Sequence, residues 1–170
     1  MAYQVEVIPQ VGVVVDGKTV HLEDTRENVE RTLGAPSGSR WNSLYYFDNE
    51  LRVDFDEEGR VEFIELLGGP EGKLQPVIFG LKAFQVEPEA VVELLKEKNG
   101  GDFVDAENGY SYAFRKLSVG LYRESVPENV AEMIEEARAD GHPLSEGDIE
   151  QEKRRTHWAT IGVGAENYYE

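Results

Sequence analysis

Residues 43–67, SLYYFDNELRVDFDEEGRVEFIELL, contain three apolar runs in which buried-type and polar residues alternate. A period of two is typical of β-strands that bury one face. Asp48 and Asn49 separate the first run from the second, and "DEEG" separates the second from the third; both are turn-forming sequences. This segment therefore predicts an antiparallel meander of three strands.

A short helix is predicted immediately before the meander. In EDTRENVERTLGAP, from Glu23 to Pro36, Asp24 or Thr25 can accept hydrogen bonds from the first helical turn. The glycine and proline at the end of this segment stop the helix. A β-hairpin closed by the dipeptide "DG" is predicted upstream of it, within residues 5–20. The first half thus combines a helix with an antiparallel meander.

The same order of patterns returns after the glycine-rich linker GGPEG, residues 68–72. An apolar run is followed by a helical segment, EPEAVVELLKEKNGG, and then by a hairpin segment, YSYAFRKLSVGLY. Apolar positions of the two helices and the two meanders correspond, for example Leu51 with Leu117. Such self-similarity predicts an internal duplication.

We therefore predict an α+β fold in a single compact domain, residues 1–170. It consists of two tandem halves, each a helix plus an antiparallel meander, at about 16–67 and 76–125. Residues 126–170 are expected to form a C-terminal extension of two helices and a final strand. The helices lie in PENVAEMIEEARADG and SEGDIEQEKRR, and the strand in HWATIGVG.

The composition excludes several classes of protein. The chain has 170 residues, 40% of them hydrophobic, and no cysteine, so neither a disulfide framework nor a thiolate zinc site is expected. No apolar run approaches the length that crosses a bilayer, and the N-terminus lacks the basic and apolar segments of a secretion signal. These features predict a cytoplasmic protein.

The charge of the chain is its most unusual bulk property. With 34 acidic and 17 basic residues the formal net charge is −17 and the pI about 4.5. Nucleic acid and anionic membrane surfaces repel such a chain, so neither is expected as a partner. Solubility alone explains the charge, or the chain docks on a basic protein, where opposite potentials speed the encounter.

The segment DFDEEGRVEFIE, Asp54–Glu65, has carboxylates and a glycine at several positions of an EF-hand calcium loop. Its flanks alternate with a period of two, which predicts strands in place of the helices of an EF-hand. A straight strand would carry Glu65 away from Asp54 and Asp56, and Glu58 stands where the motif requires Asp or Asn. No metal site and no cofactor are predicted.

The outward face of the meander carries aromatic and acidic residues together. If Tyr46 faces Leu51 toward the core, alternation places Tyr45 and Phe47 on the opposite side. Tyrosine supplies contact area in protein interfaces, and acids attract a basic partner. The predicted contact surface consists of Tyr45, Phe47, Arg52, Asp54, Asp56, Glu57 and Glu58. Alternatively, a C-terminal helix covers this face.

Motifs of catalysis are absent: the chain has no nucleophile elbow, no P-loop and no dinucleotide fingerprint. Its three histidines are not spaced as metal ligands. These absences favour a protein that is not an enzyme.

The tandem arrangement over residues 16–125, in an acidic chain without catalytic motifs, resembles small bacterial inhibitor and immunity proteins that neutralise a partner enzyme. The resemblance implies a non-enzymatic acidic binding protein whose partner is basic, such as a toxin nuclease. The alternative is an enzyme or small-molecule-binding domain with a pocket between the two halves, near His157 and Trp41.

Overall fold

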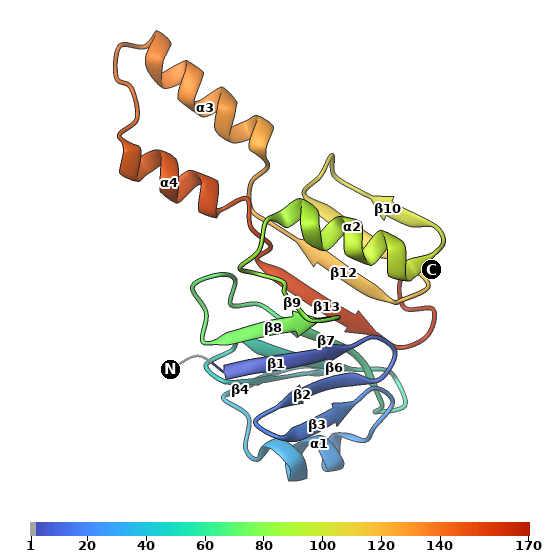
Figure 1. Ribbon diagram of the computed structural model, residues 1–170. Helices are drawn as coiled ribbons and strands as arrows, with labels where there is room; N and C mark the ends of the chain where they lie inside the picture. The colour runs from blue at the N-terminus through green and yellow to red at the C-terminus, as the bar shows by residue number, and fades with distance from the viewer. Residues whose placement is uncertain (1–2) are drawn as a thin grey trace.

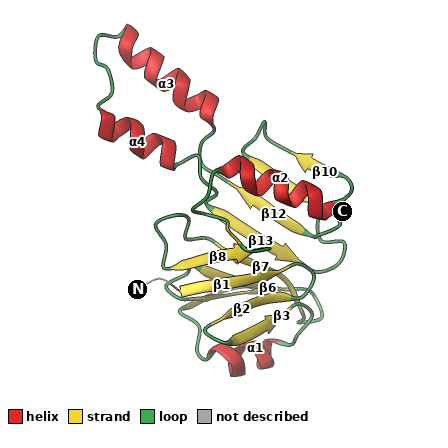
Figure 2. Ribbon diagram, viewed as in Figure 1, coloured by secondary structure: helices red, strands yellow, loops and turns green. Residues whose placement is uncertain are grey.

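The computed structural model describes residues 3–170; Met1 and Ala2, the start of the predicted domain, lie outside the described residues. The described chain contains four helices and thirteen strands in two sheets and ends on a strand, which confirms the α+β class (Figures 1 and 2). None of these four helices is long and apolar enough to span a membrane.

One layer of the fold is an eight-stranded antiparallel sheet with the order β10-β11-β12-β13-β7-β6-β5-β4. The first half supplies β4 (Gly38–Arg40), β5 (Ser43–Tyr46), β6 (Leu51–Phe55) and β7 (Val61–Leu66). The second half supplies β10 (Phe103–Asp105), β11 (Ser111–Phe114) and β12 (Val119–Tyr122), and the C-terminal extension supplies β13 (Thr160–Gly164). β13 pairs with β12 on one side and with β7 on the other, so this last strand joins the two halves at the centre of the sheet.

The second layer is a five-stranded sheet flanked by two helices (Figure 1). Its order is β3-β2-β1-β8-β9, and only β1 and β8 run parallel. The strands are β1 (Tyr3–Ile8), β2 (Gly12–Val15), β3 (Lys18–His21), β8 (Leu74–Ile78) and β9 (Leu81–Lys82). Helix α1 (Arg26–Leu33) lies beside β3, and α2 (Pro88–Asn99) lies against β11. The upstream segment, predicted as a hairpin, forms three strands, because the chain turns between β1 and β2: Gln10 has a φ of 65° and the Val11 N–H donates to the Ile8 carbonyl at 3.0 Å.

The order of elements is the same in the two halves. The succession β2-β3-α1-β4-β5-β6-β7 corresponds to β8-β9-α2-β10-β11-β12-β13 if the two helices between β12 and β13 are set aside. In the five-stranded sheet, β1 lies between β2 and β8. The last pair before the hairpin turn is Tyr46–Leu51 in one half and Phe114–Val119 in the other. Leu51 therefore corresponds to Val119, and the predicted match with Leu117 is wrong. The predicted and the observed matches differ by two residues, an even number, so the predicted inward and outward faces of the strands are retained.

The core lies between the two sheets. The predicted pairing of Tyr46 with Leu51 is observed, and β5 and β6 bury alternate residues on this side. β7 contributes Val61, Ile64 and Leu66 to the core, and a register shift opposite Asp54 and Phe55 interrupts its alternation. Asp48 and Asn49 both have positive φ, 53° and 68°, and the Glu50 N–H donates to the Phe47 carbonyl. This is the tight turn that the sequence predicts. Burial of these apolar residues against the five-stranded sheet is the main stabilising contribution to the fold.

Two helices are inserted between β12 and β13, and they project from the body as a hairpin (Figure 1). We call this hairpin, α3 (Pro127–Ala139) and α4 (Glu146–Arg154) with their connection, the arm. The capping box predicted at Ser145 is present at the start of α4. Only Val130 of α3 is buried, and no residue of α4 is. Because the arm buries so little, it contributes surface far more than core.

Candidate functional site

The outer face of the eight-stranded sheet carries Arg52 between two carboxylates. Its Nε lies 3.1 Å from Asp54 Oδ1, without the alignment of a hydrogen bond, and its Nη2 lies 3.2 Å from Glu65 Oε1. The Ser43 hydroxyl also donates to Asp54, at 2.6 Å. The side chains of Arg52 and Asp54 are only 27% and 15% exposed. Their charges are therefore largely satisfied within the sheet and contribute little to a free contact surface.

This cluster also explains what happens to the EF-hand-like segment. Asp54 and Glu65 do approach the same place, but the guanidinium of Arg52 occupies the space between them. The expectation that the hairpin separates these two carboxylates is wrong, since β6 and β7 place Arg52 opposite Glu65 and next to Asp54. Burial raises the pKa of Glu65, and the adjacent Arg52 opposes this effect.

The C-terminal residues, and not a helix, cover the middle of the outer face. Tyr168 stacks on Phe63 at 4.5 Å between ring centroids, and Tyr169 meets the same ring edge-on at 6.1 Å. Glycines beneath the two tyrosines leave room for them: an added Cβ at Gly120 would overlap the Tyr169 hydroxyl, and one at Gly164 would overlap Tyr168. Burial raises the pKa of Tyr169 far above its ordinary value.

Phe47 was expected on the outer face beside Tyr45, and the structure places it elsewhere. Its φ of 54° is left-handed, which breaks the alternation of the strand at this residue. The ring packs against the core and lies 6.3 Å from that of Tyr3. Tyr45 remains half-buried on the outer face. The two aromatic residues therefore do not form one patch.

The acidic turn, residues Asp56–Glu58, joins β6 to β7. Asp56 Oδ1 accepts hydrogen bonds from the N–H groups of Glu58 and Arg60, at 2.9 and 3.0 Å, so this carboxylate shapes the turn. Glu57 and Glu58 are exposed. A hollow of about 660 Å³ lies beside them, lined by Asn42, Phe55, Asp56, Glu57, Glu58 and Glu62. Burial, with the neighbouring carboxylates, raises the pKa of Glu62.

Trp41 lies next to this turn and is 89% exposed, more than any other large hydrophobic residue in residues 3–170. It occupies the β4–β5 turn with a φ of 53°, and the Arg40 guanidinium lies 5.6 Å from its ring centroid. The following residue, Asn42, forms two hydrogen bonds with the backbone of Phe55. Its side-chain amide donates to the Phe55 carbonyl at 2.7 Å, and its backbone carbonyl accepts from the Phe55 N–H at 2.9 Å. These bonds tie the Trp41 turn to the acidic turn.

The sequence contains a signal for this exposure that the alternation pattern does not use. Trp41 is flanked by Arg40, Asn42 and Ser43, so it interrupts a polar segment and has no apolar neighbour to accompany it into a core. The expectation that Trp41 and His157 share a pocket is wrong. In the described residues 3–170, the two clefts lined by His157 do not include Trp41, and β5 connects the Trp41 turn to the opposite end of the sheet.

His157 lies instead at the root of the arm, between two adjoining clefts. One has a volume of about 780 Å³ and lies between α3, α4 and the body, and the other, of about 850 Å³, lies on the far side of α4. The residues shared by both clefts are Pro70, Glu71, Glu150, Arg154 and His157. A cleft therefore exists near His157, but it is formed by the arm and the body.

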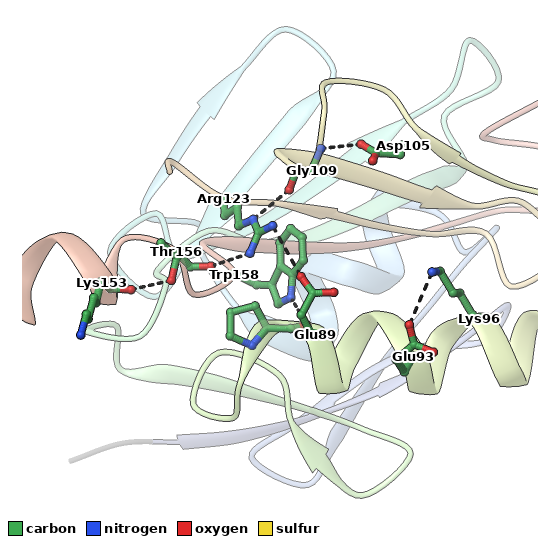
Figure 3. Close-up of polar contacts among 10 residues, drawn as sticks. Glu89, Glu93, Lys96, Asp105, Gly109, Arg123, Lys153, Thr156 and Trp158 are labelled. Atoms are coloured by element: carbon green, nitrogen blue, oxygen red, sulfur yellow. Dashed lines mark hydrogen bonds and ion pairs between the residues drawn. The ribbon is translucent and has the colours of Figure 1, made fainter. Parts of the chain in front are cut away.

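Arg123, at the end of β12, connects the root of the arm to the body (Figure 3). It is 3% exposed, and its Nε and Nη1 donate to the carbonyls of Gly109 and Thr156, at 2.8 and 3.2 Å. Its guanidinium lies 4.7 Å from the centroid of Trp158, whose indole N–H donates to the Pro88 carbonyl at 3.0 Å. These contacts join α2, β12 and the segment that leaves α4.

Within the described part of the chain, no group of three or more histidine, aspartate and glutamate side chains has the geometry to hold a metal ion. Comparison of the chain with protein-family models, with curated proteins and with solved structures found no match, so no enzyme family and no catalytic homologue was found.

Proposed function

We propose that this protein is a non-enzymatic binding protein that neutralises a basic protein partner, such as a toxin nuclease. The proposed contact surface is Trp41 together with the acidic turn and Glu62. It keeps Asp56, Glu57 and Glu58 from the surface predicted by the sequence. It replaces Tyr45 and Phe47 by Trp41 as the aromatic anchor.

The observation that carries the proposal is the exposure of Trp41. A side chain of this size gains free energy when it leaves water, and tryptophan is enriched among the residues that dominate binding energies in interfaces. The fold does not use the indole for its own stability, since 89% of the residue remains in solvent. A partner that covers it would gain this energy.

The charge around Trp41 indicates the kind of partner. Glu57 and Glu58 are exposed, and neither forms an ion pair among residues 3–170. The net charge of −17 extends the same field over the whole chain. Opposite potentials raise association rates, and they discriminate against acidic partners through repulsion. A basic protein is therefore the complementary surface.

The test begins with capture of partners on the immobilised protein at physiological salt, with a Trp41→Ala matrix in parallel. The proposal expects a basic protein that the wild type retains and the Trp41→Ala variant loses. Surface plasmon resonance on that protein should then show faster dissociation for the variant and a loss of about 2 kcal/mol or more in binding.

The acids are tested with the triple variant Glu57→Gln, Glu58→Gln and Glu62→Gln. Association should slow and become less dependent on salt, while dissociation changes much less. The matched control neutralises three exposed acids of the arm, Glu128, Glu132 and Glu136. Retention of the same basic protein by the Trp41→Ala and triple variants, at unchanged rates, would refute this contact surface. If the arm control slows association equally, the acids near Trp41 act only through the net charge of the protein and not as a specific contact.

A further inference from the structure

The end of α4 is basic in a strongly acidic chain. Lys153, Arg154 and Arg155 are consecutive, and His157 follows after one residue. Arg155 is paired with Glu124 and Glu152, at 3.4 and 3.1 Å. Lys153 has no carboxylate within ion-pair distance among residues 3–170. Lys153, Arg154 and His157 all line the cleft of about 780 Å³ between the arm and the body, which also has the carboxylates of Glu71, Glu87 and Glu150 in its lining.

A carboxylate of the chain itself already occupies part of this cleft. Glu71 Oε1 lies 2.6 Å from Arg154 Nη1, and both residues line the two clefts at the root of the arm. The two side chains are 72% and 61% exposed. An ion pair so open to water contributes little to stability, so another anion can displace it at small cost.

The loop that presents Glu71 is held in place by side-chain amides. The Gln75 amide donates to the carbonyls of Gly69 and Gly72, at 3.2 and 2.7 Å, and the Gln85 amide donates to that of Pro70 at 3.0 Å. The GGPEG segment is therefore an ordered wall of the cleft, although the sequence predicts only a linker. These bonds hold the loop backbone, while the Glu71 side chain is 72% exposed and can leave Arg154 without moving the loop.

His157 lines the same two clefts as Glu71 and Arg154. Its Nδ1 lies 3.0 Å from the Phe84 carbonyl, and a carbonyl oxygen only accepts, so Nδ1 carries the hydrogen. Nε2 has no hydrogen-bond partner among the described residues, and the residue lines both clefts. With the hydrogen on Nδ1, Nε2 can accept from the hydroxyl of hydrogen phosphate.

We propose that the cleft at the root of the arm binds a small oxyanion, a phosphate or a carboxylate, that displaces Glu71 from Arg154. Arg154 is the principal contact because its guanidinium matches the geometry of both groups. Lys153 and His157 supply further contacts from the same cleft. This site is separate from the surface around Trp41 and does not depend on the proposed partner.

The test is a titration of the labelled full-length chain, followed by amide NMR shifts, at constant ionic strength. Inorganic phosphate and citrate are the two probes, and chloride is the ionic-strength control. We expect saturable shifts at residues 153–157 and 69–71, with a dissociation constant of about 1 mM. A response to one probe only identifies the ligand chemistry.

Two substitutions act in opposite directions. Glu71→Gln removes the internal competitor, an exposed ion pair, and should tighten binding by about two- to fivefold, whereas Arg154→Gln should weaken it by about tenfold or more. Arg138→Gln is the matched control, because Arg138 is a similarly exposed arm arginine paired with Glu135 at 3.5 Å. The proposal is overturned if Glu71→Gln shows no saturable shift with either probe. It is equally overturned if Arg154→Gln binds as the wild type does, or if chloride reproduces the shifts.

Discussion

Replacement of Arg123 by alanine is expected to lower the free energy of unfolding by about 3 kcal/mol. The guanidinium makes charge-assisted hydrogen bonds to two carbonyls and lies over Trp158. Each such hydrogen bond contributes about 1.5–3 kcal/mol, and a desolvated cation–π contact about 2 kcal/mol. The cost of burying the guanidinium, which alanine avoids, offsets about half of this sum. Glu89 adds little, because it lies 3.8 Å away and is 66% exposed.

The loss is measured by urea denaturation followed by circular dichroism, with thermal denaturation as a second measure. For a chain of this length, 3 kcal/mol corresponds to a decrease in Tm of about 6–12 °C. Arg138→Ala is the control: this exposed arginine should change stability by no more than about 0.5 kcal/mol.

A second variant separates charge from shape. Arg123→Lys keeps a cation near Trp158, but one ammonium cannot reach both the Gly109 and the Thr156 carbonyls as the guanidinium does. It should lose an intermediate amount of stability. The reasoning is refuted if Arg123→Ala costs less than about 1 kcal/mol, or if Arg123→Lys is as stable as the wild type.

Two further predictions concern titrating groups. Burial raises the pKa of Tyr169, so a near-ultraviolet alkaline titration should find that one of the eight tyrosines does not ionise before unfolding. Because the unfolded chain loses this proton first, stability should fall as the pH rises above the ordinary tyrosine pKa. Ionisation of all eight tyrosines together would contradict this. The Gly120→Val variant, which displaces Tyr169, should abolish the difference in ionisation between Tyr169 and the other tyrosines. Burial also raises the pKa of Glu62 and Glu65, so the native state takes up protons before the unfolded state as the pH falls from neutral toward the ordinary carboxyl pKa. Stability should therefore rise over that interval and rise less in Glu62→Gln; an equal slope in the variant would exclude Glu62 as a source of the effect.

Local patterns in the sequence predict most of the individual elements. Alternation in residues 43–67 predicts the strands, their buried faces and the pairing of Tyr46 with Leu51. Asp48 and Asn49 predict the tight turn because both tolerate positive φ. The capping box at Ser145 predicts the start of α4. In each case the interacting residues are close in the chain, so a short window contains the whole interaction.

The candidate sites are less accessible from the sequence. The acidic turn is visible as a polar run, but alternation cannot show that Arg52 neutralises Asp54 or that a left-handed φ turns Phe47 to the core. The exposure of Trp41 depends on the turn that contains it, and this turn is held by a hydrogen bond from Asn42 to Phe55, a residue of another strand. These properties are decided by contacts between strands, which a pattern along one strand does not contain.

By itself, the sequence determined the α+β class, the order of the four helices, and the three strands of residues 43–67, because a single strand or helix already contains those periodicities. Only the tertiary structure decided that β13 pairs with β7 after the arm, that Tyr168 and Tyr169 cover the glycines of the sheet, and that Glu71 meets Arg154. The physical reason is that backbone hydrogen bonds are alike for every pair of strands. The choice of neighbour is made by side-chain packing and charge across the whole fold.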